Sequence, residues 1–276
     1  MGTCKEYRIP LATSFGSRGK RDEMKTLLLD CDGVLADTEL YGHFPAFNYA
    51  FEEAGLPFRW ELDEYRELVL IGGGKERIRQ YFERHPEYRT GLTEADLDGL
   101  VARLHETKTQ KYIETIESGK IPGRPGVRRL VDQATADGWT VAMASTSAVS
   151  SVKAVVNAVL TPNSIDGIFA GDSVKAKKPA PDIYLAAVSA LRADPQQTVV
   201  IEDSNPGATA AFNAGLRHLV TVSALTRDAA FPHASLVVTS LGEPNEEPAS
   251  VLAGPAELLH GSVVTMQTLE GILESA

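Results

Sequence analysis

Two aspartates separated by a single residue, Asp30 and Asp32, are the residues whose type and spacing most directly suggest chemistry. They follow a short apolar run, 26–29, which is typical of a buried parallel strand. Because side chains alternate along a strand, Asp30 and Asp32 point the same way and Cys31 points the other. Gly33 then lets the backbone turn sharply. The pattern predicts two carboxylates that project together from the carboxyl end of a strand, where open α/β sheets bind ligands.

Polar side chains also follow three later apolar runs. They are Ser145, Thr146 and Ser147 after 140–144, Lys178 after 167–170, and Glu202 and Asp203 after 198–201. Each motif alone is compatible with a helix cap, a turn or a solvated charge pair. If all four runs are strands of one parallel sheet, however, their polar ends meet at one edge of that sheet.

These residue types suit phosphoryl transfer. Asp30, Glu202 and Asp203 supply the carboxylate oxygens that Mg²⁺ prefers, and Mg²⁺ also binds substrate phosphate. Ser145 precedes a helix, where a hydroxyl and backbone N–H groups hold phosphate oxygens, and Lys178 supplies a positive charge. An ionised acid at the metal can attack phosphorus, which suits Asp30. A second acid can protonate the leaving alkoxide and then deprotonate water, which suits Asp32.

The elements that must position these residues alternate along the second half of the chain. Apolar runs at 140–144, 167–170, 198–201, 219–222 and 236–238 are separated by helical patterns at 127–137, 149–160, 183–191 and 208–214, and a last helix is expected at 266–274. Residues 240–262, rich in Pro, Glu and Gly, are expected to form a loop. This alternation predicts an α/β fold with a doubly wound, mostly parallel sheet.

Residues 40–118 have a different pattern. Helical spacing recurs at 47–54, 61–70, 75–85 and 93–117 without strand-type alternation, and 121–126 contains two prolines and two glycines. We therefore expect a catalytic core, 25–39 plus 119–276, interrupted by a helical cap domain, 40–118. Residues 1–24 show no clear period and are expected to be a flexible tail.

Composition limits the classes of partner and compartment. Lys plus Arg is 27 and Asp plus Glu is 37, a net charge of −10, which argues against general binding of nucleic acid or anionic membranes. No apolar run is long enough to span a membrane, and no signal peptide is visible. We do not expect a disulfide between Cys4 and Cys31. These features favour an intracellular protein of the cytoplasm or the plastid stroma, and we expect a monomer.

At this point the sequence resembles the haloacid dehalogenase-like hydrolase superfamily. The resemblance rests on Asp30-Cys31-Asp32-Gly33-Val34, Ser145, Lys178-Pro179-Ala180-Pro181-Asp182 and Glu202-Asp203-Ser204-Asn205-Pro206-Gly207, and it spans about residues 25–225. It implies Asp30 as nucleophile and Asp32 as general acid and base. It also implies Mg²⁺ held by Asp30, the Asp32 carbonyl and Asp203, with Glu202 in support. Because dehalogenases lack the second acid, it favours a phosphatase or phosphomutase.

The cap is expected to choose the substrate. Glycines at 72–74 open a helix beside Lys75 and Arg77, so the backbone can approach a ligand, although a flexible loop is an equally good explanation of the residues alone. A lone histidine such as His43 is more often structural. Arg124, in the return hinge, suits bidentate contact with a second phosphate. The candidate substrate-binding residues are Glu39, His43, Gly73, Gly74, Lys75, Arg77, Arg124, Thr146 and Ser147.

These cap and hinge residues look like the CbbY-type branch of the superfamily. That resemblance implies recognition of a sugar bisphosphate, specifically hydrolysis of xylulose-1,5-bisphosphate, a misfire product that inhibits Rubisco. The alternative is a β-phosphoglucomutase, which has the same core and cap. There the second-strand motif usually continues Ser-Lys-Asn, whereas this chain has Ser147-Ala148-Val149. A remote alternative is a non-catalytic sugar-phosphate sensor.

Overall fold

A seven-stranded sheet forms the centre of the protein, whose computed structural model describes residues 24–275. The strand order is β3-β2-β1-β4-β5-β6-β7, and every neighbouring pair is parallel except β6 and β7. The strands are β1 (Thr26–Leu29), β2 (Thr140–Ser145), β3 (Gly167–Ala170), β4 (Thr198–Glu202), β5 (Arg217–Thr221), β6 (Leu236–Val238) and β7 (Val251–Ala253). The first strand therefore lies in the middle of the sheet, between β2 and β4, so its end faces the ends of both neighbours.

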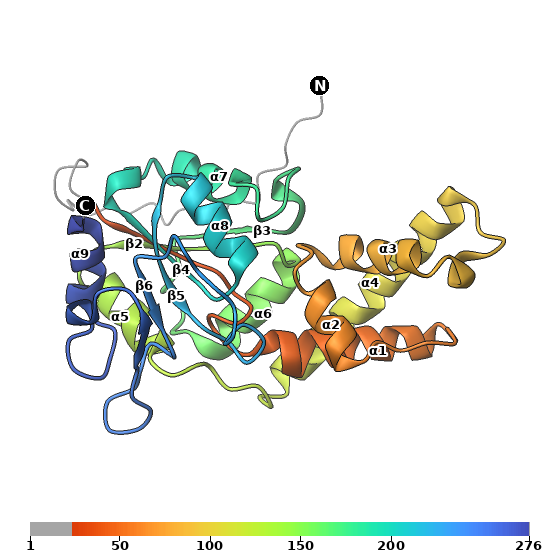
Figure 1. Ribbon diagram of the computed structural model, residues 1–276, viewed down its shortest axis with the longest axis horizontal. Coiled ribbons are helices and arrows are strands. Elements are labelled where there is room, and N and C mark those ends of the chain that lie inside the picture. Colours follow the sequence, from red (N-terminus) through yellow and green to blue (C-terminus); the bar gives the residue numbers. More distant parts are fainter. Residues whose placement is uncertain (1–23, 276) are drawn as a thin grey trace.

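Helices cover both faces of this sheet (Figure 1). One face packs on α5 (Val127–Ala136), α6 (Val149–Val159) and α9 (Met266–Glu274), and the other on α7 (Asp182–Leu191) and α8 (Asn205–Asn213). Alternation along β1 explains the division, because Leu27 and Leu29 belong to the first hydrophobic cluster and Leu28 to the second. The short 3₁₀ helices are Pro86–Arg89, Gly171–Ser173, Pro195–Gln197 and Ala256–Leu258.

The cap helices extend from one end of the sheet as a separate arm (Figure 1). They are α1 (Phe44–Glu53), α2 (Leu62–Leu68), α3 (Gly74–Arg84) and α4 (Glu94–Glu117), preceded by one π-helical turn, Glu39–His43. Their interior is aromatic and has its own hydrophobic cluster, built around Phe47, Phe51, Trp60, Tyr65 and Phe82. Aromatic side chains bury large areas, so these four helices can form a stable core of their own.

The α/β prediction is confirmed, and the differences are local. The expected loop 240–262 contains the antiparallel edge strand β7, which the sequence pattern missed because its three residues are mostly exposed and do not alternate in polarity. Helix α8 begins at Asn205 rather than at 208, since Ser204 caps it and Pro206 fits its first turn.

The predicted division into a core and an inserted cap remains our proposal, and the separate aromatic cluster of the cap supports it. Of the predicted tail, residues 1–23 lie outside the described residues, as does Cys4; Cys31 is buried with a free thiol. Among residues 24–275, no helix combines the length and the apolar composition needed to cross a membrane.

Candidate active site

The carboxyl ends of β1, β2 and β4 open into a cleft between the sheet and the cap. Its lining contains most of the residues expected from the sequence: Asp30, Asp32, Glu39, His43, Gly73, Gly74, Arg77, Ser145, Thr146, Ser147, Lys178 and Asp203. The enclosed volume is about 130 Å³. Ligand pockets usually measure about 300–1,000 Å³, so admission of a sugar phosphate requires the cap to move.

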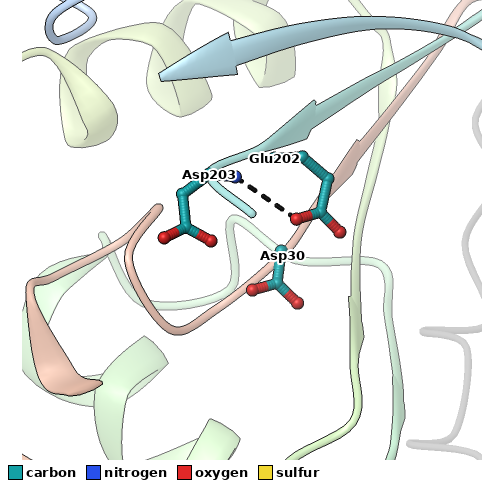
Figure 2. A group of neighbouring side chains, drawn as sticks. All are labelled: Asp30, Glu202 and Asp203. Carbon is teal, nitrogen blue, oxygen red and sulfur yellow. Dashed lines mark hydrogen bonds between the residues drawn. The ribbon is translucent and has the colours of Figure 1, made fainter. Parts of the chain in front are cut away.

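Three carboxylates gather at the core side of this cleft, at the ends of β1 and β4 (Figure 2). Asp30, Glu202 and Asp203 each offer an oxygen, and these oxygens lie within 4.8 Å of one another. All three residues are buried, and Glu202 is fully inaccessible to solvent. One lysine lies among them, since Lys178 Nζ donates to Asp30 Oδ1 and Glu202 Oε1, each at 2.6 Å.

The single lysine does not balance the three acids. Burial raises the pKa of Asp30 to about 8, helped by the charges of Glu202 and Asp32, although Lys178 pulls it downward. Burial also raises the pKa of Asp203 well above its usual value, again with the nearby charges of Asp30 and Glu202. The two aspartates are therefore short of positive charge in the metal-free protein.

This donor set fits a hard divalent cation. Glu202 is already occupied, because it also accepts hydrogen bonds from the Tyr184 hydroxyl, the Ser204 hydroxyl and the Asp203 amide. Asp30 and Asp203 keep carboxylate oxygens directed at the cleft, so they are the direct ligand candidates and Glu202 supports them. A bound cation would supply the missing positive charge, and Mg²⁺ prefers such all-oxygen sites.

Asp32 lies in the opposite electrostatic environment. Burial by itself would raise its pKa, but the charge and hydrogen bond of His43, with hydrogen bonds from Ser147 and Thr38, outweigh burial and hold the pKa well below the usual value. His43 Nε2 lies 3.0 Å from Asp32 Oδ1, and Thr38 Oγ1 donates to the same oxygen at 2.5 Å. Tyr112 adds a fourth donor at 3.1 Å, and the Ser147 hydroxyl donates to Oδ2.

His43 connects Asp32 to a buried lysine. Lys108 Nζ lies 2.7 Å from His43 Nδ1, and the His43 ring stacks on Tyr112 with 3.9 Å between centroids. With Lys108 charged, His43 Nδ1 accepts from it and Nε2 donates to Asp32; with Lys108 neutral, a charged His43 donates from both nitrogens. Burial lowers the pKa of Lys108 to about 8, so this lysine can give up its proton near neutral pH. The three side chains form a line of proton carriers from the cap to Asp32.

The second strand contributes the hydroxyl groups. Ser145 ends β2 almost fully buried, and its Oγ accepts from the Ser147 amide at 3.2 Å. Thr146 and Ser147 occupy the turn before α6, and both line the cleft. Hydroxyls and amides at the start of a helix are suited to phosphate oxygens. These three residues line the same cleft as the acids that follow β1 and β4.

The glycines and Arg77 form the cap wall. A side chain at Gly72 would come within 2.8 Å of the Lys178 carbonyl, and Gly73 has a φ of 97°, a conformation that favours glycine. Arg77 is buried and donates to Glu39, Tyr65 and backbone carbonyls of the α2–α3 link. Its charge is thus largely neutralised by Glu39, whose own pKa Arg77 lowers against the effect of burial.

Two cations lie away from the positions expected of them. Lys75 is exposed and lines a separate groove beside His105, Thr109 and Ala148. The Arg124 guanidinium is directed at backbone carbonyls of the core, and Arg124 does not line the cleft. The two terminal nitrogens of the guanidinium donate to those carbonyls in this conformation, so its expected contact with a second phosphate stays a prediction.

Sequence reasoning missed Lys108, Thr38 and Tyr112. The signal for Lys108 lies in the buried stripe of α4, which reads Leu97, Val101, Leu104, Lys108, Tyr112 and Ile116. A lysine in the apolar stripe of an amphipathic helix is costly unless it is used, and this departure could have singled it out. Thr38 had no such signal, since a threonine at a helix start is ordinary.

Comparison with known proteins identifies the family of hydrolases to which the chain is similar. A family model described as haloacid dehalogenase-like hydrolase matches residues 24–215. A CBBY-like protein of Arabidopsis thaliana is 45% identical over 225 residues, covering 80% of this chain and 70% of that protein. Protein CbbY of Rhodobacter capsulatus is 40% identical over 208 residues, with coverage of 74% and 88%.

A crystal structure supports the same assignment. It is of a CbbY mutant from Rhodobacter sphaeroides in complex with xylulose-(1,5)bisphosphate, with a TM-score of 0.72, 36% identity and coverage of 80% of this chain and 97% of that chain. The family model spans all the acids at the strand ends of this chain, from Asp30 to Asp203. The chain is therefore a CbbY-like member of the haloacid dehalogenase-like hydrolase family.

Proposed function

We propose that the protein is a Mg²⁺-dependent sugar-phosphate phosphatase that forms an aspartyl-phosphate intermediate, with xylulose-1,5-bisphosphate as its substrate and xylulose 5-phosphate and phosphate as products. One observation carries the proposal. Asp30 and Asp32 lie in the segment that follows β1 and face the same cleft, yet their surroundings shift their pKa values in opposite directions. Two acids separated in this way can take the two roles that phosphate-ester hydrolysis needs.

The residues divide the reaction into two halves. An Asp30 carboxylate oxygen attacks phosphorus, the bond from phosphorus to the sugar oxygen breaks, and Asp32 delivers a proton to that oxygen. Water then attacks phosphorus, Asp32 takes its proton, and the bond to Asp30 breaks. A bound Mg²⁺ would offset the negative charge of the phosphoryl group and keep Asp30 ionised. Lys178 remains beside Asp30 throughout, while Ser145 and Thr146 hold phosphoryl oxygens.

The proton for the first half comes along the cap. Asp32 is ionised in the free protein, so it needs a donor before it can act as an acid. His43 contacts it at 3.0 Å and Lys108 contacts His43 at 2.7 Å, which gives a direct path. A path of this kind operates only while the cap is closed, because His43 and Lys108 lie on the hinge and on α4.

A second phosphate would meet Lys108. Arg77 is paired with Glu39, and Lys178 with Asp30 and Glu202, whereas no ion pair joins Lys108 to a carboxylate within residues 24–275. Lys108 instead lies over the Phe47 and Tyr112 rings, at 4.7 and 5.3 Å from their centroids. An anion in the cap half of the cleft therefore gains most from this cation. The bisphosphate bound to the related CbbY of known structure supports the same substrate class.

A panel of phosphate esters with Mg²⁺ tests the proposal. Phosphate release from xylulose-1,5-bisphosphate should exceed release from glucose 1-phosphate and glucose 6-phosphate by about 100-fold in kcat/KM, since one charge-assisted contact contributes about 1.5–3 kcal/mol. Interconversion of the two glucose phosphates without net phosphate release would replace the proposal by a mutase. Tight binding of the bisphosphate without turnover would replace it by a sensor. We also propose that the protein is a monomer, that it acts in the cytoplasm or the plastid stroma, and that it binds neither nucleic acid nor membranes.

A further inference from the structure

Arg124 is the residue through which the cap hinge contacts the core most extensively. Its side chain is 8% exposed and donates to four carbonyl oxygens from three core segments: Gly33, Thr221 at 3.1 Å, Val222 at 2.5 Å and Thr239 at 3.2 Å. Thr221 is the last residue of β5, and Gly33, Val222 and Thr239 lie beyond the ends of β1, β5 and β6. A planar guanidinium holds five donors in a fixed fork, so it can serve carbonyls from several segments in one geometry.

Two of these contacts hold the neighbours of Asp203. Gly33 adopts a left-handed conformation, with φ of 80°, and a side chain there would collide with the Asp203 carboxylate. The turn at Gly33 is therefore packed directly on Asp203. Val222 precedes Ser223, a neighbour of Asp203 that lines the same cleft. The Arg124 guanidinium thus fixes the backbone on both sides of Asp203 without touching it.

The same residue joins the two linkers of the cap. The Arg124 amide donates to the Leu35 carbonyl at 2.8 Å, and Ala36 and Gly123 form an antiparallel bridge. Its Nε lies 3.8 Å from Asp37 Oδ1, an oxygen with no hydrogen-bond partner. The linker into the cap at 35–37, the linker out of it at 123–124 and the sheet edge that carries Asp203 therefore all lie next to the Arg124 side chain.

We propose that Arg124 is a positioning residue for the metal site: it orients Asp203 through the Gly33 turn and the Val222–Ser223 backbone, and it makes the cap hinge part of the same rigid unit. This inference rests on the proposed function only in taking Asp203 as a ligand of the metal. It is an alternative to the contact with a second phosphate that the sequence suggested. Residues that orient metal ligands typically cost about 10–100-fold in metal affinity or activity when they are removed.

The test compares Arg124→Ala with Arg129→Ala. Arg129 is a matched control, because it also donates to three backbone carbonyls, those of Leu241, Gly242 and Val264, but none of these adjoins a proposed metal ligand. Calorimetric titration with Mg²⁺ alone, without any ester, should show about tenfold weaker binding in Arg124→Ala and unchanged binding in Arg129→Ala. Hydrogen exchange of the metal-free protein should show lost protection at 33–37 and 221–223 in Arg124→Ala alone.

Kinetics adds a readout that separates the possible roles. Arg124→Ala should lower kcat/KM for xylulose-1,5-bisphosphate and for p-nitrophenyl phosphate by the same factor, about 10–100-fold, and added guanidinium ion should restore part of both. A loss confined to the bisphosphate would overturn the inference in favour of direct phosphate binding. Wild-type Mg²⁺ affinity and turnover with only a lower Tm would overturn it in favour of a purely structural role.

Two further arms keep the result decisive. If Arg124→Ala does not fold, Arg124→Lys retains the charge but not the fork of donors, and it should show an intermediate loss of Mg²⁺ affinity; wild-type affinity in that variant contradicts the inference. If the wild-type protein hydrolyses no ester, the proposed function fails, while Mg²⁺ titration and hydrogen exchange still decide the role of Arg124.

Discussion

The cleft has two acidic regions that differ in what surrounds them. On the core side, Asp30, Glu202 and Asp203 share one lysine, and the pKa values of Asp30 and Asp203 are raised. On the cap side, Asp32 alone receives four hydrogen bonds, and its pKa is lowered. Three of the Asp32 donors come from outside the sheet: Thr38 and His43 lie between β1 and α1, and Tyr112 lies on α4. This difference supports our proposal that the core side binds a cation and that the cap side serves proton transfer.

Asp30→Asn removes the proposed nucleophile on the core side and should have the largest effect on kcat. An amide cannot act as the nucleophile, and loss of a nucleophile costs about 10⁴–10⁶-fold in kcat. Phosphate release under saturating substrate and Mg²⁺ measures it. Residual activity within about tenfold of wild type would show that no bond forms between Asp30 and phosphorus.

Asp32→Asn changes the acid on the cap side of the cleft. It removes the group that gives and takes the proton, which should lower kcat by about 10²–10⁴-fold with little change in KM. Single-turnover kinetics should also show the phosphorylated enzyme lasting longer, because water attack loses its base. A variant with wild-type kcat would assign proton transfer to another group.

Lys108→Met sharpens the comparison by removing the cap cation while keeping its length and apolar contacts. We expect KM for the bisphosphate to rise about 10–100-fold, since a charge-assisted contact is lost, with a smaller change for a monophosphate. Because the same substitution interrupts the proposed proton path to His43, kcat should fall for both esters. Lys75→Met is the control, because Lys75 lines a different groove and should leave KM within about twofold. Equal rises in KM for both variants would mean that the cap holds the distal group elsewhere.

Mg²⁺ should stabilise the protein more at high pH than at low pH. The pKa of Asp30 is about 8 in the folded, metal-free protein and about 4 when unfolded, so folding binds a proton between these values. Stability without metal is therefore lost as pH rises through this window, and a cation that replaces the proton restores it.

The rise in Tm is the measurable form of this effect. At 100 times Kd, Mg²⁺ contributes about 2.7 kcal/mol, or about 5–10 °C in Tm, at pH 8, and much less at pH 5. Asp30→Asn, scanned in the same way, should lose most of this dependence on pH. A Tm increment from Mg²⁺ that is independent of pH would contradict the assignment of the raised pKa to the metal-binding edge.

The sequence predicted the core side of the site better than the cap side. Asp30, Ser145 and Asp203 each lie at the end of an apolar run, so parallel topology alone brings them to one edge. Lys178 lies in the segment between β3 and α7. Arg124 and Lys75 do not line the cleft in this structure, because a hinge or helix start has several backbone paths and the sequence does not say where a long side chain ends. Lys108 was missed because its position depends on how α4 packs on the hinge, a tertiary contact without a local motif.

The covalent intermediate is the most direct test of the division between the two acids. Asp32→Asn protein, mixed with xylulose-1,5-bisphosphate and Mg²⁺ and quenched in acid within one turnover, is digested and analysed by mass spectrometry. The account predicts one phosphoryl group per chain, carried on the Asp30 side chain and absent from the Asp30→Asn protein. Release of phosphate during that turnover with no phosphorylated Asp30 at any quench time would contradict it.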